Sequence, residues 1–183
     1  MRYYILNSSL CAERDDPWAL RPVRTPREFD YFMQGNSGNT LIAESLRRLA
    51  DGTAWGHHPN MWRMTPDEIP VDRINAECGL LVMCMQDQIQ PGMVLRNVPC
   101  ITEVLDRIRI PKICLSLGAN ALAGTPPKTV ADGLQPSVTE FVRHVMRTFD
   151  GVSVRGEFTA EVIRLLGFGD CAVHGCPSYY RQG

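Results

Sequence analysis

The chain has 183 residues, a formal net charge of -1, 44% hydrophobic residues and 21% charged residues. Its length and composition are those of one globular domain. The near-neutral charge excludes a general electrostatic attraction to nucleic acid or to an anionic membrane surface, and no apolar run is long enough to predict a transmembrane helix.

Seven cysteines are scattered along the chain, and two of them, Cys84 and Cys114, lie inside apolar runs. An odd number without paired spacing predicts reduced core thiols in a cytosolic protein rather than a disulfide framework. Residues 1–16 also lack the long apolar region of a signal peptide. We therefore expect a cytoplasmic protein.

The N-terminal part of the chain is predicted to be irregular. Residues 2–6 form a short apolar run typical of a strand, but three prolines and mixed charges between residues 7 and 27 predict a loop. We assign residues 1–30 to an irregular segment of a single domain that covers residues 1–183. Residues 28–34, EFDYFMQ, are aromatic and apolar enough to predict a further strand.

Residues 35–49, GNSGNTLIAESLRRL, predict a small-residue loop that runs directly into an amphipathic helix. Ile42, Leu46 and Leu49 fall on one face of that helix. Such a loop exposes backbone N–H groups and the positive end of the helix dipole, which suits an anion or a sugar hydroxyl. An ordinary Asn/Gly turn before a helix would give the same pattern, so both interpretations remain open.

The rest of the chain alternates between strands and helices. Residues 51–70 and 118–133, rich in Gly and Pro, predict long loops, and Ser137 with Glu140 predicts an N-cap with a capping box. The alternation predicts an α/β fold with a Rossmann-like parallel sheet and helices on both faces. Strands are expected at 78–86, 112–117, 151–154 and 171–174, and helices at 101–110, 137–149 and 157–166.

Ligands of such sheets bind outside the carboxyl ends of the strands. The segments expected there are 35–40, 86–90, 118–121 and 155–159. Arg155 follows a predicted strand and precedes Gly156 and a helix, and its fork of donors suits a phosphate or a carboxylate. A surface ion pair with Asp or Glu is the alternative interpretation of this arginine.

The histidines and cysteines do not predict a metal site. Cys171, His174 and Cys176 are close in sequence, but their spacing is not that of a zinc ribbon or finger, and strand alternation sends Cys171 and His174 to opposite faces. His57 and His58 are expected in a loop, either solvated or touching a ligand. Walker A, G-x-S-x-G and G-x-G-x-x-G motifs are absent from the sequence.

Four segments in a fixed order carry a family resemblance. They are GNSGN at 35–39, IPKICLSLGA at 110–119, SVRGEFTAEVIRLLG at 153–167 and HGCPS at 174–178. In this order and spacing they resemble the polysaccharide pyruvyl transferase family. The resemblance covers most of residues 35–178.

The resemblance implies a specific activity. Members of the family have two Rossmann-like domains that face each other in a GT-B-like arrangement. They transfer the pyruvyl unit of phosphoenolpyruvate to a sugar as a ketal, in surface or capsular polysaccharide synthesis, and the chemistry requires no further cofactor and no metal. It implies that Arg155 holds the phosphoenolpyruvate anion and that the 35–39 loop faces the acceptor sugar. Substrate contacts are expected from Gly35, Asn36, Gly38, Asn39, Gly118 and Gly156.

This chain departs from the family at its end. The family's second domain carries an Arg-x-His-type motif that supplies the general acid, and this chain stops at Gly183, where that domain should begin. We therefore expect half of an active site, which needs a second domain or another copy. Two alternatives remain: a non-catalytic glycan-binding or assembly module, and a glycosyltransferase-like domain that uses a nucleotide sugar.

Overall fold

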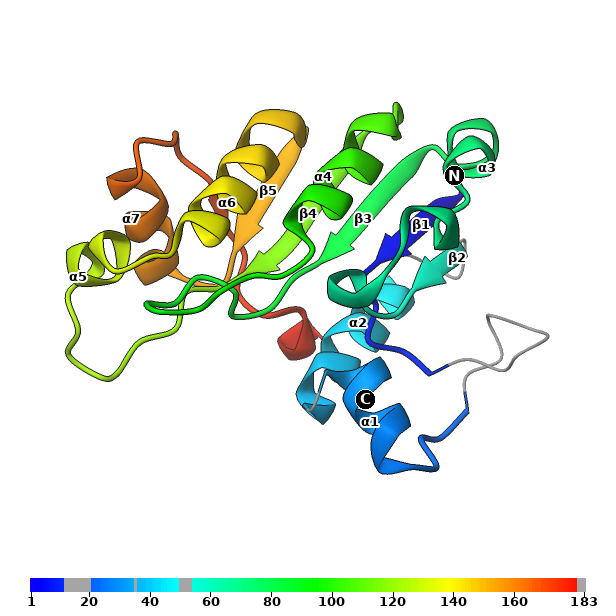
Figure 1. Cartoon of the computed structure of the whole chain (residues 1–183), viewed down its shortest axis with the longest axis horizontal. Coiled ribbons are helices and arrows are strands. Elements are labelled where there is room, and N and C mark those ends of the chain that lie inside the picture. The colour runs from blue at the N-terminus through cyan, green and yellow to red at the C-terminus, as the bar shows by residue number, and fades with distance from the viewer. Residues whose placement is uncertain (12–20, 35, 50–53, 181–183) are drawn as a thin grey trace.

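The structure, a computed structural model, describes residues 1–11, 21–34, 36–49 and 54–180. Its centre is a six-stranded sheet in which every pair of neighbouring strands is parallel, in the order β2-β1-β3-β4-β5-β6 (Figure 1). This confirms the predicted Rossmann-like α/β fold. The strands are β1 (Tyr3–Leu6), β2 (Ala54–His58), β3 (Leu80–Cys84), β4 (Lys112–Leu117), β5 (Gly151–Val154) and β6 (Ala172–Val173).

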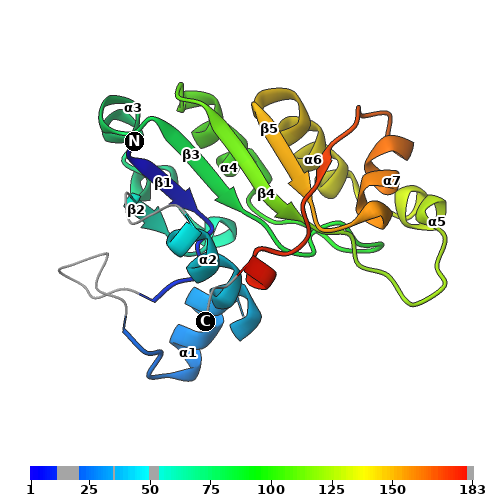
Figure 2. The ribbon, with the colours of Figure 1, turned by 180° about the vertical axis from the view of Figure 1, so that it is seen from behind.

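Helices cover both faces of the sheet, as expected. The helices α4 and α6 lie in front of the sheet in Figure 1 and behind it in Figure 2, whereas α2 packs from the other side. In the described part of the chain the α-helices are α1 (Pro26–Met33), α2 (Ser37–Leu49), α3 (Val71–Glu77), α4 (Val98–Arg107), α5 (Pro127–Asp132), α6 (Pro136–Thr148) and α7 (Glu157–Leu165). No helix among the described residues is long and apolar enough to cross a membrane.

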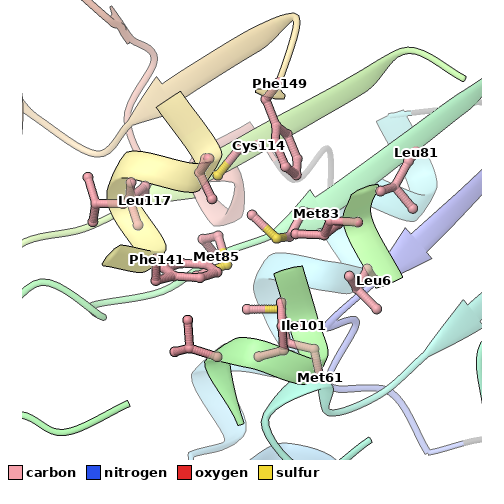
Figure 3. Close-up of a cluster of buried hydrophobic side chains, with 14 of the residues drawn as sticks. Leu6, Met61, Leu81, Met83, Met85, Ile101, Cys114, Leu117, Phe141 and Phe149 are labelled. Atoms are coloured by element: carbon pink, nitrogen blue, oxygen red, sulfur yellow. The ribbon is translucent and has the colours of Figure 1, made fainter. Parts of the chain in front are cut away.

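The larger core lies under α4, α6 and α7. Leu81 and Met83 of β3 point toward Ile101 of α4 and Phe141 of α6, and all four side chains are fully buried (Figure 3). Burying an aliphatic or aromatic side chain of this size contributes about 1.5–3 kcal/mol each. The central strands are apolar on both faces because helices cover both sides.

A smaller core lies on the opposite face, under α2. Ile42 and Leu46 of α2 pack against Ile5 of β1 and Val82 of β3, which confirms the sheet-packing role predicted for these two helix positions. The side chain of Leu49, the third predicted contact, lies outside what the structure describes. Docking α2 here fixes the position of its N-terminal end relative to the sheet.

The predicted strand at residues 28–34 is wrong, because residues 28–33 belong to α1 and Gln34 is its C-cap. The backbone N–H of Glu28 donates to Thr25 Oγ1 at 3.1 Å, and the N–H of Thr25 donates to Glu28 Oε2 at 3.2 Å. This reciprocal capping box, with Pro26 at the first helical position, starts a helix despite the aromatic content that follows. Residues 26–30, which were assigned to the irregular N-terminal segment, are therefore helical.

Three further predictions need correction. The helix α6 begins at Pro136 with Gln135 as its N-cap, and the hydroxyl of Ser137 accepts the backbone N–H of Leu95 at 3.1 Å instead of capping the helix. The predicted loop at 51–70 contains β2, so His57 and His58 are strand residues, and the loop at 118–133 contains α5. The helix α3 was not predicted.

The strand order creates a topological switch point between β1 and β3. The chain leaves β1 toward β2 on one side, and β4, β5 and β6 follow β3 on the other. At such a point the connections diverge and leave a crevice at the carboxyl ends of the strands. Figure 2 shows α2, α1 and the C-terminal end of the described chain gathered at that edge, where the turn Pro177–Tyr180 contacts α2.

Candidate functional site

A cavity of about 790 Å³ opens at the carboxyl edge of the sheet, beside this switch point. Its wall comes from the start of α2, the segments after β3, β4 and β5, and the C-terminal loop. It therefore unites segments from all four sequence regions that were expected at this edge. The lining residues are Gln34, Asn36, Gly38, Asn39, Leu41, Ile42, Trp62, Arg63, Gln86, Asp87, Gln88, Gln90, Met93, Val94, Leu95, Arg96, Asn120, Arg155, Cys176 and Ser178.

The ion pair between Arg155 and Asp87 forms part of the wall. Arg155 Nη1 donates to Asp87 Oδ1 at 2.7 Å, and Arg155 Nε donates to the Ser116 hydroxyl at 3.0 Å and to its carbonyl at 3.2 Å. The alternative interpretation of Arg155, an ion pair, is thus what the structure shows. A second nitrogen, Nη2, has no hydrogen bond among the described residues, so the guanidinium keeps a free donor.

Ser116 accepts from Arg155 because β4 is irregular at that point. Its φ is 67°, and the register between β4 and β5 shifts between Cys114 and Leu117. A bulge of this kind re-aims a strand end, and such irregularities concentrate near functional sites. Here the bulge turns the Ser116 carbonyl and hydroxyl toward the guanidinium.

Gly118 lies beneath this ion pair rather than in the cavity wall. A Cβ at this position would collide with Asp87 Oδ1 and lie 3.1 Å from Arg155 Cδ. The residue is therefore required for the close approach of β4 to the pair. Gly156, the N-cap of α7, is also not among the lining residues, and a Cβ there would meet nothing within 4 Å.

Three of the residues expected to contact substrate lie in the cavity lining at the start of α2: Asn36, Gly38 and Asn39. Asn36 Oδ1 accepts the N–H of Gly38 at 2.8 Å, and Asn39 Nδ2 donates to the Met33 carbonyl at 3.2 Å. One polar atom of each amide thus bonds to a helix end. The other, Nδ2 of Asn36 and Oδ1 of Asn39, has no partner among the described residues. Gly35, the remaining member of the predicted loop, lies outside the described residues.

A network of buried amides holds the strand ends together. Asn7 Nδ2 donates to the Cys84 carbonyl at 2.9 Å and to Gln86 Oε1 at 3.2 Å. Asn7 Oδ1 accepts from Gln34 Nε2 at 2.7 Å and from the Met61 N–H at 3.4 Å. Because a backbone carbonyl and a backbone N–H fix the two ends of Asn7, the orientation of the Gln86 amide follows from it.

Two buried donors in the lining residues are left without a partner. Gln86 Nε2 and Trp62 Nε1 make no hydrogen bond among the described residues, and neither nitrogen reaches the surface. An unmade hydrogen bond of a buried polar group costs about 1–3 kcal/mol. The third such atom in the described chain, His144 Nε2, belongs to α6 and does not line the cavity.

The charge of the cavity lining is positive. Its charged residues are three arginines and one carboxylate, Asp87. Arg63 pairs with Asp30 at 2.7 Å outside the lining, whereas Arg96 is exposed and makes no ion pair among the described residues. The cavity therefore attracts anions even though the chain as a whole carries -1.

The histidines of β2 lie beside the cavity and do not line it. Ser8 Oγ lies 2.8 Å from His57 Nδ1, and burial lowers the pKa of His58 to about 4, although Glu68 lies 3.7 Å from its Nε2. His58 is thus neutral near pH 7. In the described chain no group of three His, Cys, Asp or Glu side chains is arranged to hold a metal ion.

The cysteines belong only partly to the core. All seven are free; Cys11, Cys78, Cys84 and Cys114 are buried, and Cys100, Cys171 and Cys176 are half-buried. Burial raises the pKa of the Cys84 thiol to about 12, so it is an uncharged core residue rather than a nucleophile. Cys176, which lines the cavity, lies 3.1 Å from the Ser178 hydroxyl through its Sγ.

Several lining residues carried no signal in the sequence. Gln34 and Trp62 come from segments predicted as a strand and a loop. Asn7, which holds the amide network beside the lining, falls at the start of a predicted loop. Only their convergence at the switch point reveals them. Asp87 and Gln86 lay in a segment expected at the carboxyl edge, and a polar pair directly after a buried strand was the available signal.

Comparisons of this chain with family profiles, with curated proteins and with solved structures find no match.

Proposed function

We propose that this chain forms one wall of the active site of a polysaccharide pyruvyl transferase-like enzyme, which transfers the pyruvyl unit of phosphoenolpyruvate to two sugar hydroxyls as a ketal. The observation that carries the proposal is that two motifs far apart in the sequence meet in one cavity. Asn36, Gly38 and Asn39 lie more than a hundred residues from Arg155 in the sequence, yet all line one cavity. Both motifs are part of the family resemblance, which rests on the sequence and not on this geometry.

The residues of this wall can supply some of the groups that the reaction requires. One hydroxyl adds across the double bond of phosphoenolpyruvate: its oxygen bonds to C2, the methylene carbon takes up one proton, and the hydroxyl gives up one. Phosphate then leaves with the oxygen of the C2–O bond, and a second hydroxyl takes its place, its proton leaving with the phosphate. Cationic donors at the departing phosphate lower the barrier because negative charge develops there. Arg155 Nη2 and Arg96, which have no partner among the described residues, supply such donors on this wall.

A general acid for the methylene carbon is missing from this wall. The carboxylate of Asp87 is held by Arg155, and the lining that the structure describes includes no histidine. In this proposal the acid comes from a second domain or a second copy that closes over the cavity. The chain by itself is then a weak binder without turnover.

The test is phosphate release from phosphoenolpyruvate with an oligosaccharide acceptor, measured on the chain together with its second domain. Arg155→Ala should lower turnover by roughly 10²–10³, the size of effect seen when one charge-stabilising donor is removed. An unchanged rate would remove Arg155 from the reaction. Arg164→Ala is the matched control, because Arg164 pairs with Glu161 on the exposed side of α7.

A glycan-binding module without catalysis is the second candidate. The specific observation for it is that seven lining residues carry neutral amide side chains, which offer donors and acceptors to hydroxyls without any charge. Calorimetry separates the two functions. Oligosaccharide binding with no response to phosphoenolpyruvate, even with a second domain present, would favour the module.

A further inference from the structure

We infer that Gln86 is a specificity residue of this cavity, and that its Nε2 donates a hydrogen bond to a neutral oxygen of the bound ligand, a sugar hydroxyl. The inference rests on the proposed function only for the ligand class. The geometry itself concerns a rigidly held donor that has no partner among the described residues. Gln86 belongs neither to the loop at residues 35–39 nor to the motif around Arg155.

The side-chain amide of Gln86 cannot flip to give its Nε2 a hydrogen-bond partner. Its Oε1 accepts from Asn7 Nδ2 at 3.2 Å and lies 3.5 Å from Gln88 Nε2. If the amide flipped, two nitrogens would face each other at the Asn7 contact, because Asn7 is itself fixed by the Cys84 carbonyl at 2.9 Å. The donor side of Gln86 is therefore held in one direction by the fold.

The main chain around Gln86 is equally fixed. Its carbonyl accepts the N–H of Gly118 at 3.0 Å and the N–H of Gln88 at 2.9 Å. Only 5% of the residue is exposed, and it lines the cavity. A buried side chain tied at both its backbone and its Oε1, with one donor left over, is a preorganised hydrogen-bond donor rather than a solvated surface amide.

The chemistry of the neighbourhood favours a hydroxyl over an anion at this point. Gln86 is uncharged, and the side chains that hold it, Asn7, Gln34 and Gln88, are uncharged amides. The arginines of the lining belong to other segments. An anion is attracted to those arginines, whereas the amide cluster suits a group that can both accept and donate. A site that binds a hydroxyl in this way rejects ligands that lack it, because the buried donor is then left unpaired.

The nitrogen of Gln86 is covered by surrounding protein atoms. Binding therefore includes a small displacement of neighbouring side chains that opens the way from the cavity to Nε2. Trp62, whose Nε1 makes no hydrogen bond among the described residues, also lines the cavity. A ligand that changes the surroundings of the Trp62 indole changes its fluorescence, and this signal does not depend on catalysis.

The experiment measures the binding of methyl glycosides of galactose, glucose and mannose to the chain, by saturation-transfer NMR and by Trp fluorescence. At least one glycoside should bind, and Gln86→Met should weaken it about tenfold. The same substitution at the exposed Gln135, Gln135→Met, is the matched control and should leave the affinity unchanged. Equal affinity of wild type and Gln86→Met, or no glycoside binding to the wild type, overturns the inference.

A second measurement does not depend on the stability of the variant. Monodeoxy analogues of the bound glycoside are compared on the wild type, and removal of one particular hydroxyl should cost about tenfold. Equal affinity for every monodeoxy analogue overturns the inference, whether or not Gln86→Met folds. The proposed function fails separately: Gln86-dependent glycoside binding without phosphate release from phosphoenolpyruvate, even with a second domain, would refute pyruvyl transfer and leave this inference standing.

Discussion

Arg155 and Asp87 are 68 residues apart in the sequence, and their side chains meet with Nη1 and Oδ1 2.7 Å apart. The pair joins the carboxyl ends of β5 and β3 across the end of β4, which lies between them. It is half-buried, with 23% of the Arg155 side chain and 43% of the Asp87 side chain exposed. The ion pair therefore both braces the sheet edge and holds the guanidinium toward the cavity.

We expect a modest but measurable coupling energy between these two residues. In a double-mutant cycle with Arg155→Met and Asp87→Asn, the coupling should be about 1 kcal/mol, because water still screens the carboxylate. Urea unfolding of the four proteins measures it. The pair Lys128–Asp132, which is more exposed on both sides, serves as control and should show about 0.3 kcal/mol. A coupling no larger than the control would mean that the pair does not brace the sheet edge.

Gly118→Ala should separate the ion pair. The added Cβ would collide with Asp87 Oδ1, a short side chain that cannot move without leaving Arg155. We expect a loss of about 1–3 kcal/mol in the free energy of unfolding, as for other overpacked sites. Gly156→Ala is the matched control. Its Cβ has open space and its φ of -173° is extended backbone, so the stability should stay the same or rise slightly. Equal effects of the two substitutions would contradict the packing role of Gly118.

The arrangement of the sheet could be predicted where strands are buried on both faces. The runs at 78–86, 112–117 and 151–154 contain β3, β4 and β5 because continuous burial leaves a continuous apolar run in the sequence. The strand β2, AWGHH, has no such run. It pairs only with β1, at the edge of the sheet, so its formation depends on that neighbour and not on local propensity.

The site could be predicted only in part, for a related physical reason. Arg155 and the asparagines before α2 stand out locally, since each precedes a helix. Asn7, Gln34 and Trp62 gain their roles from contacts between distant segments. At residues 28–34 the strand prediction rests on the aromatic content, whereas the Thr25 capping box starts a helix there.

His58 should make the stability of the chain depend on pH. Burial lowers its pKa to about 4 in the folded state, below the ordinary value of 6.5 in the unfolded chain. Between these values the unfolded chain binds a proton that the folded chain does not bind. Stability is therefore complete above pH 6.5 and falls as the pH drops toward 4, by about 3 kcal/mol from this residue.

Urea midpoints between pH 4 and pH 7.5 measure this effect in the wild type and in His58→Gln. The variant should lose most of the slope in that window. His144, whose pKa burial also lowers, contributes a slope of the same sign in both proteins. The comparison between the two proteins, rather than the wild-type slope alone, isolates His58. Parallel curves would show that His58 takes up its proton equally in the folded and unfolded states.

Asn7 should be among the most sensitive polar positions of the fold. It is fully buried, with a φ of 62°, and its amide joins Cys84 at the end of β3 and Gln86 just beyond to Gln34 after α1. Asn7→Ala would leave several of these groups without partners and would put a Cβ-bearing residue without a hydrogen-bonding side chain into the left-handed region. We expect a loss of roughly 2–4 kcal/mol in the free energy of unfolding.

The matched control for this prediction is Asn75→Ala. Asn75 also bridges two segments, since its Nδ2 donates to the Arg107 carbonyl at 3.0 Å and its Oδ1 accepts the N–H of Arg109 at 2.8 Å. These bonds are exposed, so water replaces them when the side chain is removed, and the loss should stay below about 1 kcal/mol. If both substitutions cost the same, burial does not set the strength of the Asn7 network. The orientation of the Gln86 donor would then need another cause.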